Sequence, residues 1–378
     1  MRILLVCDSI DPALGGGTAE RTFQLAKALQ RLGHIAMLLT TTVGLTTERR
    51  AQLAEFECLL LDNVGRRFYL PLASPKRIAD WIARADVVQI TGHWSWLSGI
   101  SSLLARRQNK PYFYCPAGSL PVAGRSRLLK KLYNIVLGFR LVRHAERCMV
   151  VTDAERPDFI PYGIAAESPL LIPNGVCLDV LQEPYLSPRW PPGTAASPLI
   201  AFLGRLAPIK GPDLLLEAFA EIIQTYPAAR LVMAGSDFGE RATLVAMAER
   251  LGIAGQVEFT GNLQPDSKYP LLDAADFLVI PSRKEAMSIV ALEAGLMGTP
   301  VLLTDQCGFN EVEHIGGGRV VQVAAQAIAD GMRQMLAHRD SLHSQGQQLK
   351  QFVLQHYTWQ EVAQRSLDAY SRKTTTSF

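Results

Sequence analysis

The feature that most constrains the fold is an alternation of short apolar runs with helical patterns, which occurs twice along the chain. In the first half it comprises Ile3–Cys7, a helix near Thr18–Leu32, Ile35–Thr40, Asp86–Ile90, Tyr112–Cys115 and Cys148–Val151. In the second half it comprises Leu199–Leu203, a helix over Asp213–Tyr226, Arg230–Ala234, Val257–Thr260, Phe277–Ile280 and Val301–Thr304. Strands that alternate with helices form parallel sheets covered on both faces. The sequence therefore predicts an α/β protein with two doubly wound, Rossmann-like domains.

A proline-rich stretch without periodicity separates the two halves and predicts a linker. The length of 378 residues suits two domains of ordinary size. We expect an N-terminal domain over residues 1–180, a linker over 181–198 and a C-terminal domain over 199–358. Residues 359–378 have helical apolar spacing and form a candidate packing helix, which we expect to cross back to the N-terminal domain.

Composition excludes several classes of protein. Lys and Arg total 38 and Asp and Glu total 35, a balance that excludes a dedicated nucleic-acid binder. With 48% hydrophobic and 19% charged residues, the chain is not disordered. The six cysteines include no C-x-x-C pair, which favours buried free thiols and a cytoplasmic location. No apolar run of 18 residues lacks a charge, so we expect any membrane contact to be peripheral.

Two cations follow the first strand of the second half. Gly204 allows a tight turn, and Arg205 and Lys210 project from the loop after it. A bidentate guanidinium and a compact ammonium are suited to binding a diphosphate. The alternative is that both are solvated loop cations.

Two carboxylates, Glu285 and Glu293, follow the strand Phe277–Ile280 and are eight residues apart. A fully helical path would separate them by about 12 Å, a distance that a nucleotide sugar spans. Glu293 would then bind ribose hydroxyls and Glu285 the transferred sugar, while the amides near Met287, Ser288 and Ile289 meet the pyrophosphate. The alternative is that Glu285 caps a helix and Glu293 lies on a solvent face.

At these residues the chain resembles the retaining glycosyltransferases of the GT-B class, family 4 and group 1, which build bacterial surface polysaccharides. The matching pieces occur in the family's order over most of the chain: Gly15-Gly-Gly-Thr-Ala-Glu-Arg21, Leu25–His34, Leu171-Ile-Pro-Asn-Gly-Val176, Gly204-Arg205 with Lys210-Gly211, Ala274-Ala-Asp276, Glu285 with Glu293, and Gly298-Thr-Pro300. The resemblance implies two Rossmann-like domains facing a central cleft. It also implies that Arg205 and Lys210 bind the donor diphosphate, Glu293 the ribose and Glu285 the donor sugar.

The acceptor side departs from the family's pattern. Many relatives carry His-x-His where this chain has Gln89-Ile-Thr91, and Pro-His-Gly where it has Pro116-Ala-Gly118. We treat the neighbouring His93 as a candidate catalytic residue near the reacting oxygen, with simple packing beside Trp94 as the alternative. The Gly15–Gly17 loop places Gly16 and Gly17 as candidate donor-phosphate contacts, or as a turn needed only for backbone geometry.

No cofactor or metal is expected, because the chain has no Asp-x-Asp pair and no Cys/His cluster. In a front-face transfer the leaving phosphate oxygen takes the acceptor proton while the cations stabilise the developing charge. The Arg125–Arg147 region is basic and amphipathic. Two interpretations of it stay open, namely peripheral contact with an anionic membrane, and ordinary helices packed on the sheet.

These features together predict a metal-independent, cytoplasmic enzyme that acts at the inner face of the membrane. It would move a hexose from a nucleotide-diphosphate sugar to a saccharide or lipid-linked acceptor, with retention, in surface polysaccharide or lipopolysaccharide synthesis. Two alternatives remain, a nucleotide-sugar-binding scaffold subunit and a sugar-nucleotide epimerase of the same fold. An oxidoreductase is disfavoured, because the Gly15–Gly17 loop lacks the third glycine of G-x-G-x-x-G.

Overall fold

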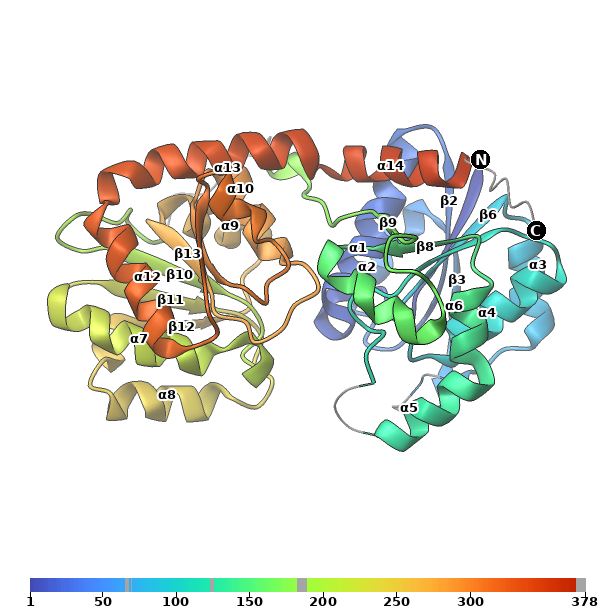
Figure 1. The fold of residues 1–378 in the computed structure, drawn as a ribbon, viewed down its shortest axis with the longest axis horizontal. Coiled ribbons are helices and arrows are strands. Elements are labelled where there is room, and N and C mark those ends of the chain that lie inside the picture. The colour runs from blue at the N-terminus through green and yellow to red at the C-terminus, as the bar shows by residue number, and fades with distance from the viewer. Residues whose placement is uncertain (65–67, 69, 123–125, 182–188, 372–378) are drawn as a thin grey trace. The chain divides into compact units, whose positions relative to one another are not determined.

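The computed structural model of the chain describes residues 1–64, 68, 70–122, 126–181 and 189–371. It divides into two compact units (Figure 1). The first comprises Met1–Gly175 together with the chain from Trp359 onward, and the second comprises Val176–Thr358. Residues 182–188 of the expected linker lie outside the described residues. Residues 189–198 belong to the second unit, where Trp190 is buried and its indole Nε1 donates to Glu258 at 2.8 Å.

The first unit contains a seven-stranded parallel sheet in the order β3-β2-β1-β6-β7-β8-β9. Its strands are β1 (Arg2–Val6), β2 (Ile35–Thr41), β3 (Glu57–Leu61), β6 (Val87–Thr91), β7 (Tyr112–Cys115), β8 (Arg147–Val150) and β9 (Leu170–Leu171). A short antiparallel pair, β4 (Asn63–Val64) and β5 (Leu70–Pro71), lies outside it. The central strands are buried on both faces, as expected where helices cover both sides of a parallel sheet.

The helices of the first unit are α1 (Pro12–Arg31), α2 (Thr47–Gln52), α3 (Pro75–Ala83), α4 (Trp96–Arg107), α5 (Arg127–Tyr133), a π-helical turn over Asn134–Gly138, α6 (Phe139–Arg143), a 3₁₀ segment over Asp153–Tyr162 and α14 (Trp359–Ser371). Although α14 is last in the chain, it packs on α1. Its Tyr370 ring meets Phe113 of β7 edge to face, and its hydroxyl donates to Gln89 of β6. The C-terminal helix is therefore part of the first unit.

The second unit contains a six-stranded parallel sheet in the order β12-β11-β10-β13-β14-β15. Its strands are β10 (Leu199–Leu203), β11 (Arg230–Ala234), β12 (Val257–Gly261), β13 (Phe277–Ile280), β14 (Val301–Thr304) and β15 (Gly318–Val321). Its helices are α7 (Pro212–Thr225), α8 (Arg241–Arg250), α9 (Pro265–Ala274), α10 (Ile289–Met297), α11 (Glu311–His314), α12 (Ala325–Ala337) and α13 (Leu342–His356). The predicted α/β fold with two parallel sheets is confirmed.

Sequence patterning missed several elements of these sheets. The edge strand β9 has only two residues and β15 is only partly buried, so their apolar signal is weak. The edge strand β3 has an apolar run, Cys58–Leu61, that the pattern did not include. All six cysteines are free thiols, but Cys58 and Cys177 are only half-buried, contrary to a uniform expectation of burial. No helix in the described part of the chain has the length and apolarity needed to cross a membrane.

The buried guanidinium of Arg21 fixes α1 to the segment that follows β9. Its Nη1 donates to the carbonyl of Pro173 at 2.6 Å and to Asn174 Oδ1 at 3.0 Å, and its Nη2 donates to the carbonyl of Ile172 at 2.8 Å. Arg21 is only 1% exposed. One buried side chain therefore donates to acceptors on three consecutive residues.

We expect Arg21→Met to lower the free energy of unfolding by about 3 kcal/mol, because methionine fills similar space but leaves these acceptors unpaired. Urea denaturation followed by circular dichroism measures this loss. Arg50→Met is the matched control, since Arg50 is exposed on α2. Equal stability of the two variants would contradict the role given to Arg21.

Candidate functional site

Each sheet has one point where the strand order reverses, and polar residues gather there. In the first unit it lies between β1 and β6, and in the second between β10 and β13. Ligands of doubly wound sheets bind outside the carboxyl ends of the strands at such switch points. The chain that follows these four strands therefore contains the candidate site residues, and each unit is described separately.

In the second unit, a close backbone approach joins the loops after β10 and β13. Gly211 has a φ of +66°, and a Cβ built on it would lie 2.0 Å from the carbonyl oxygen of Pro281. Only glycine fits there, both for its backbone angle and for its lack of a side chain. The amide of Arg283 also donates to the carbonyl of Ile209 at 2.8 Å. The two loops are thus held against each other.

This approach brings Lys210 and Glu285 together. The Lys210 Nζ lies 2.8 Å from Glu285 Oε1, and the Ser282 hydroxyl donates to the same oxygen at 2.5 Å. The Glu285 side chain is only 10% exposed. A largely buried carboxylate with two donors is held in a fixed position, which is what a group that contacts a reacting sugar requires.

A second ion pair fastens the same loops from the outside. Arg283 donates two hydrogen bonds to Asp213, at 2.8 and 2.6 Å, and a third to the carbonyl of Pro208. The helix expected over Asp213–Tyr226 begins one residue earlier, since α7 starts at Pro212 with Gly211 as its N-cap. Asp213 therefore pairs with Arg283 from within the first turn.

The helix after Glu285 begins later than the spacing argument assumed. It starts at Ile289, and Ser288 is its N-cap, with the side chain accepting from the amide of Ala291. Glu285 lies in the preceding loop, so the fully helical path between the two acids is wrong. Helix geometry leaves the amides of Ile289 and Val290 without intrahelical acceptors.

The amides of Met287 and Ser288 were also expected to contact the pyrophosphate. The Ser288 amide donates to the carbonyl of Cys307 at 3.0 Å, so that amide is already occupied, and the Ser288 side chain is fully buried. Met287 is also buried. Ile289 is the first residue of α10, so its amide has no acceptor within the helix.

Glu293 lies within α10, and its carboxylate is neither solvated nor alone. Lys268 of α9 places its Nζ 2.8 Å from Glu293 Oε1, and the two side chains are 22% and 15% exposed. Lys268 also lies over the ring of Tyr269, 4.6 Å from its centroid. No pattern in the sequence marks Lys268 as a site residue, because a single lysine on a helix is normally solvated.

Arg205 has a different environment from Lys210. Its guanidinium carbon lies 4.9 Å from the ring centroid of Phe238, and no acid pairs with it among the described residues. Phe238 is itself 44% exposed. Arg205 thus offers an uncommitted cation at the end of β10, beside the Lys210 loop.

In the first unit, the glycine loop interrupts α1. Gly16 has φ 58° and ψ −142°, and a Cβ built on it meets nothing within 4 Å. Gly15 is different, since its Cβ would lie 2.6 Å from the Cβ of Ala19. Gly16 therefore needs its freedom for the backbone turn and borders open space, whereas Gly15 is required by packing. Gly17 is exposed.

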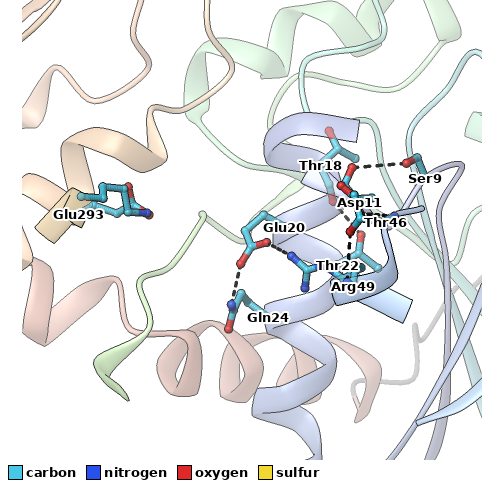
Figure 2. A network of polar contacts seen from close by, with 10 residues as sticks. Ser9, Asp11, Thr18, Glu20, Thr22, Gln24, Thr46, Arg49 and Glu293 are labelled. Carbon is cyan, nitrogen blue, oxygen red and sulfur yellow. Dashed lines mark hydrogen bonds and ion pairs between the residues drawn. The ribbon is translucent and has the colours of Figure 1, made fainter. Parts of the chain in front are cut away.

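A polar network holds the start of α1 in place (Figure 2). Asp11 accepts from the amide and hydroxyl of Thr46, at 2.9 and 2.6 Å. Glu20 lies between Arg49 and Gln24, at 2.6 Å from each. These contacts tie α1 to the loop and helix after β2, which fixes the glycine turn.

His93 follows β6 and lies in the interior. It is 1% exposed, its Nε2 donates to Asn134 Oδ1 at 2.8 Å, and its Nδ1 lies 2.8 Å from the hydroxyl of Tyr114. The Tyr162 hydroxyl is 3.2 Å from Nε2. Burial lowers the pKa of His93 to about 4, so the ring is neutral at pH 7. A catalytic role would require one of these hydrogen bonds to open, and it stays a prediction.

Sequence reasoning missed Asp8, which follows β1 at the switch point of the first unit. Its Oδ1 is buried and accepts no hydrogen bond from the described residues. Ser95 is its side-chain hydrogen-bond partner, and a Cβ built on Gly92 would lie 3.6 Å from its Oδ2. Burial raises the pKa of Asp8 to about 6, against this hydrogen bond. The signal in the sequence was an acid directly after a buried strand.

A carboxylate with one buried, unpaired oxygen should lower the stability of the fold when it is ionised. Burial raises the pKa of Asp8 in the folded protein from 3.8 to about 6. The protonated side chain therefore contributes stability at low pH, and this contribution is lost as the pH rises through about 6. We expect Asp8→Asn to gain about 2 kcal/mol over the wild type between pH 4.5 and pH 7.5. Urea denaturation at both pH values tests this, with the exposed Asp80→Asn as control. A gain that does not change with pH would contradict it.

Comparison with known proteins agrees with this arrangement. Residues 16–175 match the model of the glycosyl transferase 4-like domain, and residues 192–352 match that of the glycosyl transferases group 1. The D-inositol 3-phosphate glycosyltransferase of Nocardia farcinica is 29% identical over 321 residues, covering 77% of this chain and 69% of that protein. The enzyme of the same name from Geodermatophilus obscurus is 30% identical, covering 69% of this chain and 63% of that protein.

Solved structures share the architecture. Anabaena HepE in complex with UDP superposes with a TM-score of 0.77 at 19% identity, covering 98% of this chain and 100% of that one. WaaG, a glycosyltransferase involved in lipopolysaccharide biosynthesis, gives 0.66 at 20% identity, covering 98% and 99%. The two matched domains and the two parallel sheets lead to one conclusion: the chain belongs to the GT4-like, group 1 glycosyltransferases of the GT-B fold.

Proposed function

We propose that this glycosyltransferase moves a hexose from a nucleotide-diphosphate sugar to a saccharide or lipid-linked saccharide acceptor, with retention, in cell-surface polysaccharide synthesis. The observation that carries the proposal is the Lys210–Glu285 pair at the switch point of the second unit, beside Arg205 and the start of α10. The structures of HepE with UDP and with UDP-glucose support a nucleotide-sugar donor. WaaG supports a role in surface glycans.

On the donor side, each group has a distinct task. Arg205 and Lys210 bind the diphosphate, and the amides of Ile289 and Val290 at the start of α10 add partial positive charge. Glu293 accepts from the ribose hydroxyls, and Lys268 orients its carboxylate from the far side. We keep Gly16 and Gly17 as phosphate contacts, because the turn at Gly16 lets a ligand approach the backbone closely.

The transfer itself breaks the bond between the anomeric carbon and the diphosphate oxygen, and forms a bond to an acceptor hydroxyl on the same face. The leaving oxygen takes the acceptor proton, so no separate general base is needed. Negative charge that develops on the diphosphate is stabilised by Arg205 and Lys210. Glu285 holds the sugar hydroxyls, and Ser282 keeps its carboxylate in place. None of these steps uses a metal.

On the acceptor side, we assign Asp8 to bind a hydroxyl of the acceptor saccharide other than the attacking one, so that the proton of the attacking hydroxyl stays available to the leaving oxygen. The buried Oδ1 of Asp8 accepts no hydrogen bond from the described residues, and Asp8 follows β1 at the switch point of the first unit. Asp8→Asn should then lower transfer to acceptors in a membrane-lipid extract while leaving donor affinity unchanged. If Asp8→Asn transfers sugar at the wild-type rate in that assay, Asp8 does not bind the acceptor.

Two other activities remain testable on the same site. A scaffold subunit would bind the nucleotide sugar without turnover, and an epimerase would convert it without an acceptor. Incubation of labelled donors with and without the lipid extract distinguishes transfer, binding without turnover and epimerisation. A product that forms only when the extract is present supports transfer and neither of the other two.

We expect Lys210→Met to weaken UDP binding at least about tenfold, equivalent to about 1.4 kcal/mol, because it removes a cation from the diphosphate site. Glu293→Gln should weaken it by a similar factor through the ribose. Isothermal calorimetry with UDP, and with GDP and ADP in parallel, measures both. Glu249→Gln, at an exposed position of α8, is the control. Unchanged binding by Glu293→Gln would overturn the assignment of the ribose site.

Glu285→Gln should separate binding from chemistry. Removing the carboxylate releases Lys210 from its ion pair, so we expect UDP affinity to stay equal or to increase. Turnover of the sugar donor should fall by about 100-fold, because the sugar loses its charged acceptor. Addition of EDTA to the wild type should leave the rate unchanged. Weaker UDP binding with normal turnover would contradict the role of Glu285.

A further inference from the structure

The excess of positive charge in the first unit comes mainly from one stretch of sequence. Residues 87–145 contain no Asp or Glu, and they contain nine cations: Arg106, Arg107, Lys110, Arg125, Arg127, Lys130, Lys131, Arg140 and Arg143. The whole chain has a net charge of only +3, so the remaining residues are net negative. Arg125 lies outside the described residues. The rest of this stretch includes α5 and the π-helical turn after it.

These two elements expose apolar side chains rather than burying them. The exposed set, which we call the α5 apolar face, consists of Leu128 (81% exposed), Leu129 (48%), Leu132 (56%), Ile135 (68%) and Val136 (42%). An amphipathic helix of a globular domain normally turns such residues toward the core. Contiguous exposed apolar surface of this kind marks a contact with another phase or partner.

The helix is held in this orientation by polar anchors on its inner side. The buried Tyr133 donates from its hydroxyl to the carbonyl of Ser95 at 2.7 Å. The buried Asn134 accepts from His93 and donates to the hydroxyl of Tyr162 at 2.9 Å. The exposure of the α5 apolar face therefore follows from specific interior hydrogen bonds.

Cations border the apolar face. Arg127, Lys131 and Arg140 are exposed, and Arg140 Nη1 donates to the carbonyl of Val136 at 3.0 Å, which keeps its base on the helix. Lys130 is half-buried, with its Nζ 4.9 Å from the ring centroid of Trp94. Long basic side chains beside an apolar surface can place their charges at the level of lipid headgroups.

We propose that the α5 apolar face inserts into one leaflet of an anionic lipid bilayer, with the bordering cations on the headgroups. The proposal deepens the proposed function, on which it rests for the lipid-linked acceptor. It also makes the expectation of a basic, amphipathic surface more specific, because the structure turns leucine and isoleucine outward. A second copy of the chain is a poorer occupant, since two acid-free basic faces would repel each other.

The test is co-sedimentation with vesicles of equimolar phosphatidylcholine and phosphatidylglycerol, compared with phosphatidylcholine alone. We expect wild-type protein to bind the anionic vesicles, and Leu128→Ser/Ile135→Ser to bind them at least about tenfold more weakly. Lys131→Gln/Arg140→Gln should weaken binding too, and should reduce its sensitivity to salt. Ile160→Ser is the matched control, because Ile160 is 58% exposed elsewhere in the first unit.

Further measurements on the same variant distinguish loss of membrane binding from misfolding and from self-association. Calorimetry with UDP on Leu128→Ser/Ile135→Ser should give the wild-type affinity, which separates this proposal from the donor site. Urea denaturation followed by circular dichroism should give the wild-type stability, which shows that the variant folds. Size-exclusion chromatography over a range of concentrations detects a dimer. Vesicle binding that survives the double substitution, absence of binding by the wild type, or a dimer that the substitution dissolves would each overturn the proposal.

Discussion

Because both sheets are parallel, all their strands end at the same edge, and this constraint places the polar residues of each unit. A parallel strand buries both faces along its middle, so charged side chains lie near its two ends or in the loop that follows it. Asp8 follows β1 in the first unit, and Arg205 and Ser282 follow β10 and β13 in the second. At the switch points the connections leave neighbouring strands in opposite directions, so the strand ends there have room for a ligand.

Motifs that the chain shares with its family are explained here by two contacts. Arg21 follows the glycine loop and Asn174 belongs to the Pro-Asn-Gly segment, and the two side chains are hydrogen-bonded in the interior. Lys210-Gly211 and the Glu285 loop meet because Gly211 lacks a side chain where Pro281 approaches. Residues that are far apart in sequence thus form single physical units, which explains why the motifs occur as an ordered set.

The sequence predicted the α/β fold, the two parallel sheets and most central strands, because buried strands have strong apolar runs. It did not predict contacts that depend on tertiary structure. The ion pair between Lys268 and Glu293 joins two helices, and the orphan oxygen of Asp8 is visible only once its surroundings are known. For Glu285 the residue was identified while its loop conformation was not, because a helical pattern does not show where the helix starts.

Glu285 and Glu293 each form an ion pair with a lysine, Lys210 and Lys268 respectively. These pairs affect how a sugar donor would bind. A diphosphate competes with Glu285 for Lys210, since both are anions within reach of one ammonium. We infer that binding exchanges the partners: Lys210 turns to the phosphate and the Glu285 carboxylate, still held by Ser282, becomes free to accept from the sugar. Glu293 keeps Lys268 throughout, because that pair lies on α9 and α10, away from the exchange. The sugar-binding acid would then be released only after the diphosphate is in place.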